Sequence, residues 1–298
     1  MGFSSMDEMI QKITVNAQST RVDWNKNFLP TSAAIAGEWH CLARGAGNPT
    51  SDTIYNTGTN LAFQEVDDTV AGSGGIRHGG SVFPATKHIV NASAGTSAAT
   101  TAPAVMMLVD LLGFIRVTSV TLNTAQTINN TVGLSRYTDG AGVMAFAWNN
   151  NATALGAATP TLTLNYTNQA GVAGKVTPAV LPTCKTAAAN GLIMYSGTGA
   201  GRYNPFIPLA GGDTGIRSIQ SITLSASYVS GAFSIATCKP LITLPIGALG
   251  VVTERDYVNG LPSLPRVYDG ANLIWLMGSG AATPVNSGLF GHVDFAWN

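Results

Sequence analysis

Charge is scarce in this chain of 298 residues. Only 10% of its positions are charged, where about a quarter is usual for a globular domain, and 15 Lys and Arg residues balance 15 Asp and Glu residues. A net charge of zero excludes the basic surface with which a dedicated DNA- or RNA-binding protein neutralises phosphates. Intrinsic disorder is excluded as well, because 45% of the residues are hydrophobic and can bury a core. The sequence therefore predicts a compact protein whose partners do not include nucleic acid.

Cysteine is also rare. Cys41, Cys184 and Cys238 are an odd number at long spacings, so they provide neither a complete disulfide framework nor a CxxC pair. We interpret them as structural thiols in a reducing compartment.

The chain lacks an apolar run long enough to cross a bilayer. Its most apolar segment, 102–115, has 14 residues and contains Asp110, whereas a transmembrane helix needs roughly 20. Residues 1–12 carry acidic side chains where a secretory signal would be basic, and they lack its apolar centre. Segment 102–115 is therefore predicted to be a core element, and neither a membrane partner nor secretion is indicated.

Motifs that carry chemistry are largely missing. The sequence has no Gly-x-Ser-x-Gly nucleophile elbow. The glycine-rich run 197–201 is interpreted as a loop, because Pro205 stands where a phosphate-binding helix would propagate. The four histidines lack the short spacings of a zinc site. We therefore predict no enzymatic activity, no cofactor and no metal.

One acidic cluster leaves an alternative open. Glu65, Asp67 and Asp68 lie together in the middle of the chain, and paired carboxylates can act as acid and base on a glycosidic bond. Such a cluster more often forms a solvated edge that discourages strand pairing between molecules. The five tryptophans, which a sugar cleft would gather, are scattered through the sequence. A glycan-binding or glycan-cleaving β-protein is thus the minor alternative.

Glycine, by contrast, is plentiful, with 34 residues that favour short strands and many turns. Leu162, Leu164 and Tyr166 alternate with polar residues, which is typical of a strand with one buried face. The alternation in 222–228 resumes in 233–235 after a turn, and this predicts a hairpin. The predicted fold class is all-β, similar to a β-sandwich or jelly roll.

A single short helix is predicted near the start of the chain. Ser5 and Glu8 have the spacing of a capping box, in which each side chain satisfies a free backbone N–H of the other residue. Apolar residues follow at helical spacing within 6–14. A helix of this length is unstable unless it docks on something. Packing in the chain's own core and docking on a partner explain it equally well.

Two pairs of similar segments suggest an internal duplication. Segment 113–122 aligns with 215–224 at an offset of 102, and LSRYTDGA at 134–141 resembles LPRVYDGA at 264–271 at an offset of 130. The unequal offsets require a long insertion, and recurrent turn chemistry is the alternative. In both interpretations the Asp-Gly dipeptides of the second pair of segments, at Asp139 and Asp269, are expected in tight turns.

This pattern divides the chain into three parts. Residues 1–30 are expected to form the helix and an extended arm, 31–165 a β-domain, and 166–298 a second β-domain related to the first if the duplication is real.

Several motifs resemble those of structural proteins of tailed bacteriophages. The low charge agrees with this resemblance, since neighbours in an assembly cover surface that would otherwise need charges for solubility. The motifs are Arg21–Lys26 (RVDWNK), His78–Gly80 (HGG), Leu108–Phe114 (LVDLLGF), Arg136–Gly140 (RYTDG), Tyr195–Gly201 (YSGTGAG) and Leu264–Gly270 (LPRVYDG).

The resemblance implies a virion component, made in the cytoplasm of a bacterial host. Among such proteins a capsid cement or decoration protein fits best: a β-rich homotrimer on the capsid surface that binds the major capsid protein between capsomers. A double β-barrel major capsid protein and a tail or fibre protein are the alternatives. The usual tailed-phage shell fold is disfavoured, because no long amphipathic helix is predicted. The candidate assembly interface comprises Met6, Met9, Ile10, Ile13, Trp24 and Phe28.

Overall fold

The computed structural model describes most of the chain. The described residues are 3–28, 34, 36–97, 101–129, 133–151, 155–156, 158–179, 191–194, 204–260, 264–283 and 286–298. They form antiparallel β-sheets with one short helix near the N-terminus, which confirms the predicted all-β fold class. No helix in these ranges combines the length and the apolar character that a membrane crossing requires.

Strands account for nearly all of the regular structure. In chain order the elements are α1 (Met6–Thr14), β1 (Ser19–Asn27), β2 (Trp39–Cys41), the 3-10 helix η1 (Leu42–Arg44), β3 (Gly47–Asn48), β4 (Phe63–Glu65), β5 (Lys87–Thr96), β6 (Ala104–Val117), β7 (Gln126–Thr127), β8 (Met144–Asn149), β9 (Leu162–Asn168), β10 (Lys175–Val176), β11 (Leu192–Ile193), β12 (Ile216–Leu224), β13 (Phe233–Ile246), β14 (Thr253–Asp256), α2 (Tyr257–Gly260), β15 (Arg266–Val267), β16 (Leu273–Ser279) and β17 (Gly288–Trp297).

A closed ring of strands forms the centre of the molecule. The central sheet runs β13-β8-β11-β2-β16-β6-β4, and β13 also pairs with β6, so six of its strands close on themselves. The ring depends on β6 and β13, which are 14 residues long. They pair along nearly their whole length, with two register shifts that bend the ribbon. The predicted core element at 102–115 is thus confirmed as most of β6.

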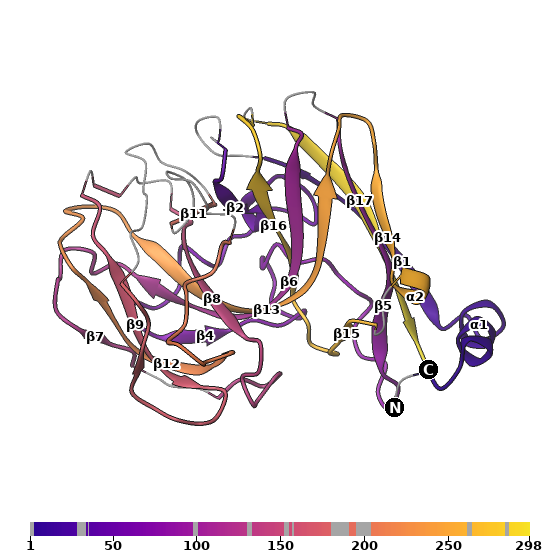
Figure 1. Cartoon of the computed structure of the whole chain (residues 1–298), viewed down its shortest axis with the longest axis horizontal. Coiled ribbons are helices and arrows are strands. Elements are labelled where there is room, and N and C mark those ends of the chain that lie inside the picture. The colour runs from indigo at the N-terminus through magenta and orange to yellow at the C-terminus, as the bar shows by residue number, and fades with distance from the viewer. Residues whose placement is uncertain are drawn as a thin grey trace.

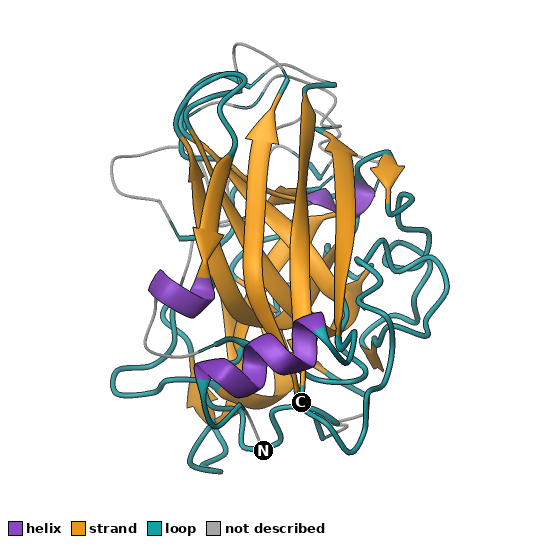
Figure 2. Cartoon of the chain, turned by 90° about the vertical axis from the view of Figure 1, so that its right-hand side faces the viewer, coloured by secondary structure: helices purple, strands orange, loops and turns teal. Residues whose placement is uncertain are grey.

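Each end of this ribbon carries a further sheet. The six-stranded end sheet has the order β14-β5-β17-β1-β3, with β15 beside β5, and the four-stranded end sheet has the order β10-β9-β12-β7. The two end sheets lie at opposite ends of the long axis, with the central ring between them (Figure 1). Helix α1 lies across the outer face of the six-stranded sheet near the chain termini (Figure 2).

Three main hydrophobic cores follow from this layering. Alternation along each strand places apolar residues on the faces that meet, and their burial drives the packing. One core lies between the four-stranded sheet and the ring and includes Leu164, Ile222 and Phe233. A second lies between the six-stranded sheet and the ring and includes Val293 and Phe295. The third fills the ring with the side chains of Trp39, Cys41, Val109, Leu111, Phe146, Trp148, Ile193, Ala236, Cys238, Ile274 and Leu276, among others.

The predicted hairpin at 222–235 is wrong. Strand β12 pairs with β9 and β7 in the four-stranded sheet, whereas β13 pairs with β6 and β8 in the central sheet. The segment between them crosses from one sheet to the other and buries Tyr228 completely. Alternation reports a buried face in each strand, but it does not say which strand is the partner.

The division into 31–165 and 166–298 stays a prediction. In the structure the position 165/166 lies inside β9, and each of the three sheets contains strands from both ranges.

Candidate assembly surface

Helix α1 begins as the sequence predicts. The Ser5 hydroxyl accepts a hydrogen bond from the Glu8 backbone N–H at 3.1 Å, and Ser5 is the N-cap of Met6–Thr14. The Glu8 carboxylate, however, accepts from the backbone N–H and the hydroxyl of Ser4, so the reciprocal half of the capping box is shifted by one residue. These hydrogen bonds from Ser4 lower the pKa of Glu8.

The apolar stripe of α1 is only half covered. Met9 is buried and Ile13 half-buried, and they pack with Val90 and Ala296 on the outer face of the six-stranded sheet. Met6 and Ile10, on the adjoining side of the stripe, are 47% and 50% exposed. The helix therefore uses part of its apolar surface within the chain and leaves the rest open to solvent.

Trp24 and Phe28 belong to the interior, which corrects their place in the candidate interface. Along β1 the inward residues alternate with exposed polar ones, and Trp24 contacts the Trp275 ring at 5.0 Å between centroids. Phe28 meets the His40 ring edge-on at 4.6 Å. Both side chains lie in the core beneath the six-stranded sheet and are 2% and 0% exposed, so they present no surface to a partner.

The outer face of the six-stranded sheet carries a fixed polar cluster. Arg21 on β1 binds the carboxylate of its cross-strand partner Asp294 through two hydrogen bonds of 2.7 and 2.8 Å. Burial alone would raise the pKa of Asp294, but the hydrogen bond and charge of Arg21 outweigh it, and the pKa is lowered. His292 lies 2.7 Å from the Ser93 hydroxyl through Nδ1 and 3.8 Å from Glu254 through Nε2. Ser93 is only 1% exposed, so this pair is no accessible nucleophile.

Apolar side chains adjoin the polar cluster on the same face. Phe290 and Val252 are 37% and 44% exposed and pack over Gly95 of β5. Leu249 and Val251 extend this patch in the loop before β14 and are exposed to a similar degree. Sequence reasoning missed the patch, although a signal exists: Leu289 and Phe290 are adjacent on one strand, so one of them must point outward.

The two similar segments 134–141 and 264–271 contact each other where the ring joins the six-stranded sheet. The rings of Tyr137 and Tyr268 contact each other edge-on at 4.7 Å, and the Arg266 guanidinium lies 4.2 Å above the Tyr268 ring. Both Asp-Gly pairs lie in turns closed by short hydrogen bonds, from Gly140 N to Tyr137 O and from Ala271 N to Tyr268 O. The predicted turns are thus confirmed.

Beside this contact lies a buried ion pair. Arg136 and Asp110 are 5% and 0% exposed and share two hydrogen bonds of 2.8 and 3.1 Å. Arg136 also donates to the carbonyl oxygens of Val66 and Leu111, and the Asn272 backbone N–H donates to Asp110. Burial raises the pKa of Asp110 despite the nearby guanidinium. Because several hydrogen bonds tie this pair to the neighbouring backbone, it holds the loops around β6 and β16 in place.

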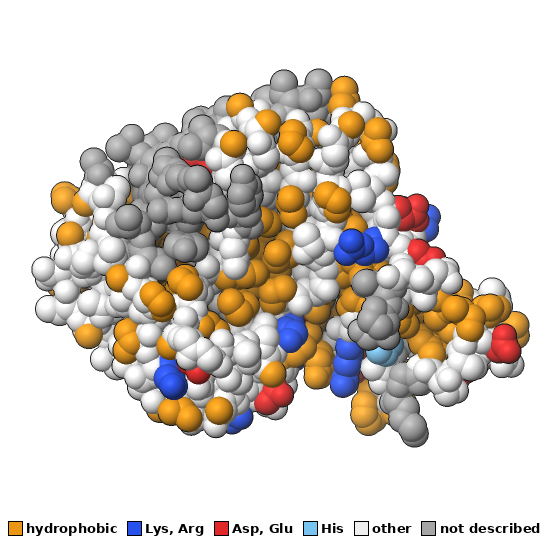
Figure 3. All heavy atoms as spheres, in the orientation of Figure 1, with side chains coloured by type: hydrophobic (Ala, Val, Ile, Leu, Met, Phe, Trp, Pro, Cys, Tyr) orange, Lys and Arg blue, Asp and Glu red, His pale blue; other side chains and the backbone are white. Residues whose placement is uncertain are grey.

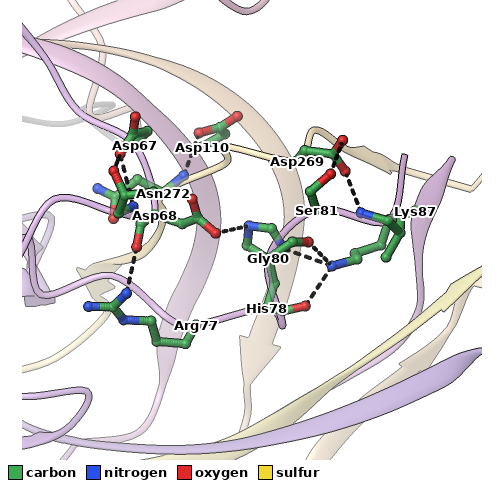
Figure 4. A network of polar contacts seen from close by, with 12 residues as sticks. Asp67, Asp68, Arg77, His78, Gly80, Ser81, Lys87, Asp110, Asp269 and Asn272 are labelled. Carbon is green, nitrogen blue, oxygen red and sulfur yellow. Dashed lines mark hydrogen bonds and ion pairs between the residues drawn. The ribbon is translucent and has the colours of Figure 1, made fainter. Parts of the chain in front are cut away.

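A buried histidine and lysine complete the network, which Figure 4 shows. Lys87 Nζ lies 3.0 Å from His78 Nδ1 and donates to the carbonyl oxygens of His78 and Gly80 at 2.7 Å. An ammonium has only donors, so Nδ1 accepts and the ring proton lies on Nε2, 3.5 Å from the Asp68 carboxylate. Burial and the Lys87 charge lower the pKa of His78 to about 4. The neutral form of His78 is therefore the native one.

The acidic cluster does not form an acid and base pair. A cavity of about 480 Å³ at the junction is lined by Asp67 and Asp269, among others. Hydrogen bonds from Thr69 lower the pKa of Asp67, whereas a general acid on a glycosidic bond needs a raised pKa. Burial raises the pKa of Asp68, but this carboxylate faces His78 and does not line the cavity. Glu65 accepts a hydrogen bond from the Ser135 backbone N–H. The cavity therefore does not pair Asp67 with the carboxylate whose pKa is raised.

Thiols and histidines form no reactive site in the part of the chain that the structure describes. Burial raises the pKa of both Cys41 and Cys238, which keeps these thiols protonated and inert. Cys184 lies outside the described residues. No group of three His, Cys, Asp or Glu side chains that could hold a metal occurs among the described residues.

Comparisons with known proteins add little. No family model matches the sequence, and no curated protein matches it. A subviral particle of infectious bursal disease virus VP2 is similar at 8% identity and a TM-score of 0.21, covering 97% of this chain and 86% of that chain. T=1 particles derived from the same virus are similar at 9% identity and a TM-score of 0.19, covering 97% and 82%. At TM-scores this low, the likeness carries no argument about this chain.

Proposed function

We propose that this chain is a structural component of a bacteriophage particle, and most specifically a capsid cement or decoration protein. In this role it binds the major capsid protein between capsomers on the surface of the shell, as a homotrimer. It is made in the cytoplasm of the bacterial host and acts in the virion.

The half-covered stripe of α1 is the observation that carries this proposal. Met6 and Ile10 stay about half exposed on a helix too short to be stable by itself, in a chain with only 10% charged residues. The exposed patch around Phe290 lies on the same face. Exposed apolar surface beside polar groups is typical of proteins that associate with others. These exposed side chains thus support a role in which neighbouring subunits of an assembly cover this face of the protein.

The mechanism is binding through many weak contacts. Symmetry repeats each small contact around an oligomer and across a shell, so each subunit needs only modest affinity. The interior suits this task, since β6 and β13 span both flanking cores and resist separation of the two ends.

The copy number of the chain per particle tests this proposal. Quantitative mass spectrometry of purified virions would compare this chain with the major capsid protein. Hundreds of copies in a simple ratio to the shell protein are expected. A few dozen copies or fewer would reject the cement role and favour a tail or fibre protein.

The central ring with a sheet at each end favours one second candidate, a double β-barrel major capsid protein. Two hydrophobic cores flank the ring, as expected of a subunit built from two β-units. The same measurement separates the two roles. A major capsid protein would be the most abundant chain of the shell, and a cement protein would accompany a second, equally abundant one.

Removal of α1 tests the role of its exposed stripe. A chain that begins at residue 17 keeps all of β1 and is expected to fold, but to lose binding to particles. The variant Met6→Ser/Ile10→Ser should bind weakly as well, whereas Gln11→Ser, an exposed polar position of the same helix, should bind like the unmodified chain. If the shortened chain unfolds, α1 is part of the core and not an anchor.

A further inference from the structure

The outer face of the six-stranded sheet has an excess of negative charge. The chain is neutral overall. This face together with α1 carries six acidic residues against four basic ones: Asp7, Glu8, Asp23, Glu254, Asp256 and Asp294 against Lys12, Arg21, Arg255 and Arg266. The acidic excess lies beside the exposed apolar side chains of Met6, Ile10, Val252 and Phe290.

Several polar groups of this face are held in place before any partner arrives. Arg21 is fixed to Asp294 by two hydrogen bonds, and Asn91 donates to Glu254. Ser93 holds the His292 ring from below. A surface that is already ordered loses little entropy on binding. Strands β5, β17 and β1 thus form a contact surface that is partly preorganised.

Asp23 is an acidic group of this face that is open to a partner. It lies on β1 opposite His292 and is exposed. Its carboxylate accepts no hydrogen bond from the described residues, and Arg21, which interacts with it electrostatically, directs its own hydrogen bonds to Asp294. A cation brought by a partner could therefore pair with Asp23 without breaking an existing contact.

The acidic excess also restricts the partner. A two-fold contact would place this face against its own copy, and like charges set opposite each other are unfavourable. An apolar surface with a rim of lysine or arginine is complementary to it in both charge and polarity.

We infer that the outer face of the six-stranded sheet, with α1, docks on an apolar surface rimmed by lysine or arginine on the shell protein of the particle. This inference rests on the proposed function and adds the face that binds and the chemistry of its partner. The four-stranded sheet, at the opposite end of the long axis, then points away from the shell (Figure 1).

A charge reversal tests this inference. The probe is the shell of the virus that encodes this chain, assembled without it, and the readout is equilibrium binding of the purified full-length chain as the salt concentration rises. Binding of the unmodified chain should weaken with salt, because exposed charges are screened. Asp23→Lys should weaken binding at low salt about tenfold and flatten its salt dependence. Glu65→Lys makes the same charge change on β4, away from this face, and should bind like the unmodified chain.

The outcomes separate the two proposals. If the unmodified chain binds and Asp23→Lys binds equally well with the same salt dependence, the docking face is wrong while the cement role stands. If Glu65→Lys weakens binding as much as Asp23→Lys, only net charge matters and the face is likewise wrong. If the unmodified chain does not bind the shells, the proposed function fails and this inference fails with it. Circular dichroism of each variant checks that it is folded.

Discussion

The two end sheets bury similar cores but present different outer faces. On β9 of the four-stranded sheet, Leu164 and Tyr166 are buried, and the alternate positions are occupied by uncharged Thr163, Asn165 and Thr167. The outer face of the six-stranded sheet instead carries charged pairs, exposed apolar side chains and a half-covered helix (Figure 3 shows hydrophobic side chains gathered around that helix). The outward positions of β9 are thus neutral and polar, although Val176 on the neighbouring β10 is 53% exposed beside them. The other face combines features that a partner would complete.

Breaking the buried ion pair of Arg136 and Asp110 should have the largest effect on the free energy of unfolding. Arg136→Ala leaves the Asp110 carboxylate buried without its partner, and we expect it to lower the free energy of unfolding by about 3–5 kcal/mol. Urea denaturation would measure this change. Arg77→Ala, an exposed arginine close by, should cost about 0.5 kcal/mol or less. The pair Arg136→Met/Asp110→Leu should recover much of the loss, and a cost below about 1 kcal/mol for Arg136→Ala would contradict this role of the pair.

Matched core truncations compare the two ends directly. Phe233 lies in the core under the four-stranded sheet and Phe295 in the core under the six-stranded sheet, and both are fully buried. Replacement of either by alanine should cost about 3–4 kcal/mol. Because β6 and β13 run through both cores, each variant should shift one single unfolding transition. Two transitions, each moved by only one of the variants, would show that the ends are separate folding units.

Acid should lower the free energy of unfolding through His78, which lies near the contact between the ring and the six-stranded sheet. Its pKa is about 4 in the folded chain and about 6.5 when unfolded, so the contribution of its neutral form to stability is complete above pH 6.5 and is lost as the pH falls towards 4. The loss would reach about 3 kcal/mol. Asp52 opposes it, because burial raises the pKa of that carboxyl to about 6 and favours its protonation in the folded chain over the same pH range.

The difference between the unmodified chain and His78→Gln isolates the histidine, since Asp52 is present in both. Free energies of unfolding measured between pH 7 and pH 4 should fall more steeply for the unmodified chain. Parallel curves would show that His78 does not titrate in this environment.

Local patterns in the sequence predicted the parts of the fold that depend on local structure. The helix at 6–14, the strand at 162–167, the Asp-Gly turns and the buried segment 102–115 each follow from spacing, capping or turn chemistry. Strand partners were not predictable in this way. Strands β12 and β13 are neighbours in sequence but pair in different sheets, since partner choice depends on long-range packing.

The candidate surface was predicted only in part for the same reason. Met6 and Ile10 were identified from helical spacing, which says which side of a helix is apolar but not how much of it is covered. Trp24 lies in the extended arm that the sequence predicts after the helix, but its place in the alternation of β1 points it inward. Val252 and Phe290 come together only through the pairing of β5 with β14 and β17.

Substitutions on the two outer faces should change stability least, and their effects on binding compare the two ends directly. Phe290→Ser on the six-stranded sheet and Val172→Ser beside the four-stranded sheet each replace an exposed apolar side chain, so each should change the free energy of unfolding by about 0.5 kcal/mol or less. Their effects on binding to shells should differ. Phe290→Ser should weaken binding about fivefold or more, because aromatic side chains contribute strongly at interfaces, whereas Val172→Ser should leave it unchanged. Equal losses in both variants would mean that the two ends contact neighbours alike, and the contrast in their charge would then need another explanation.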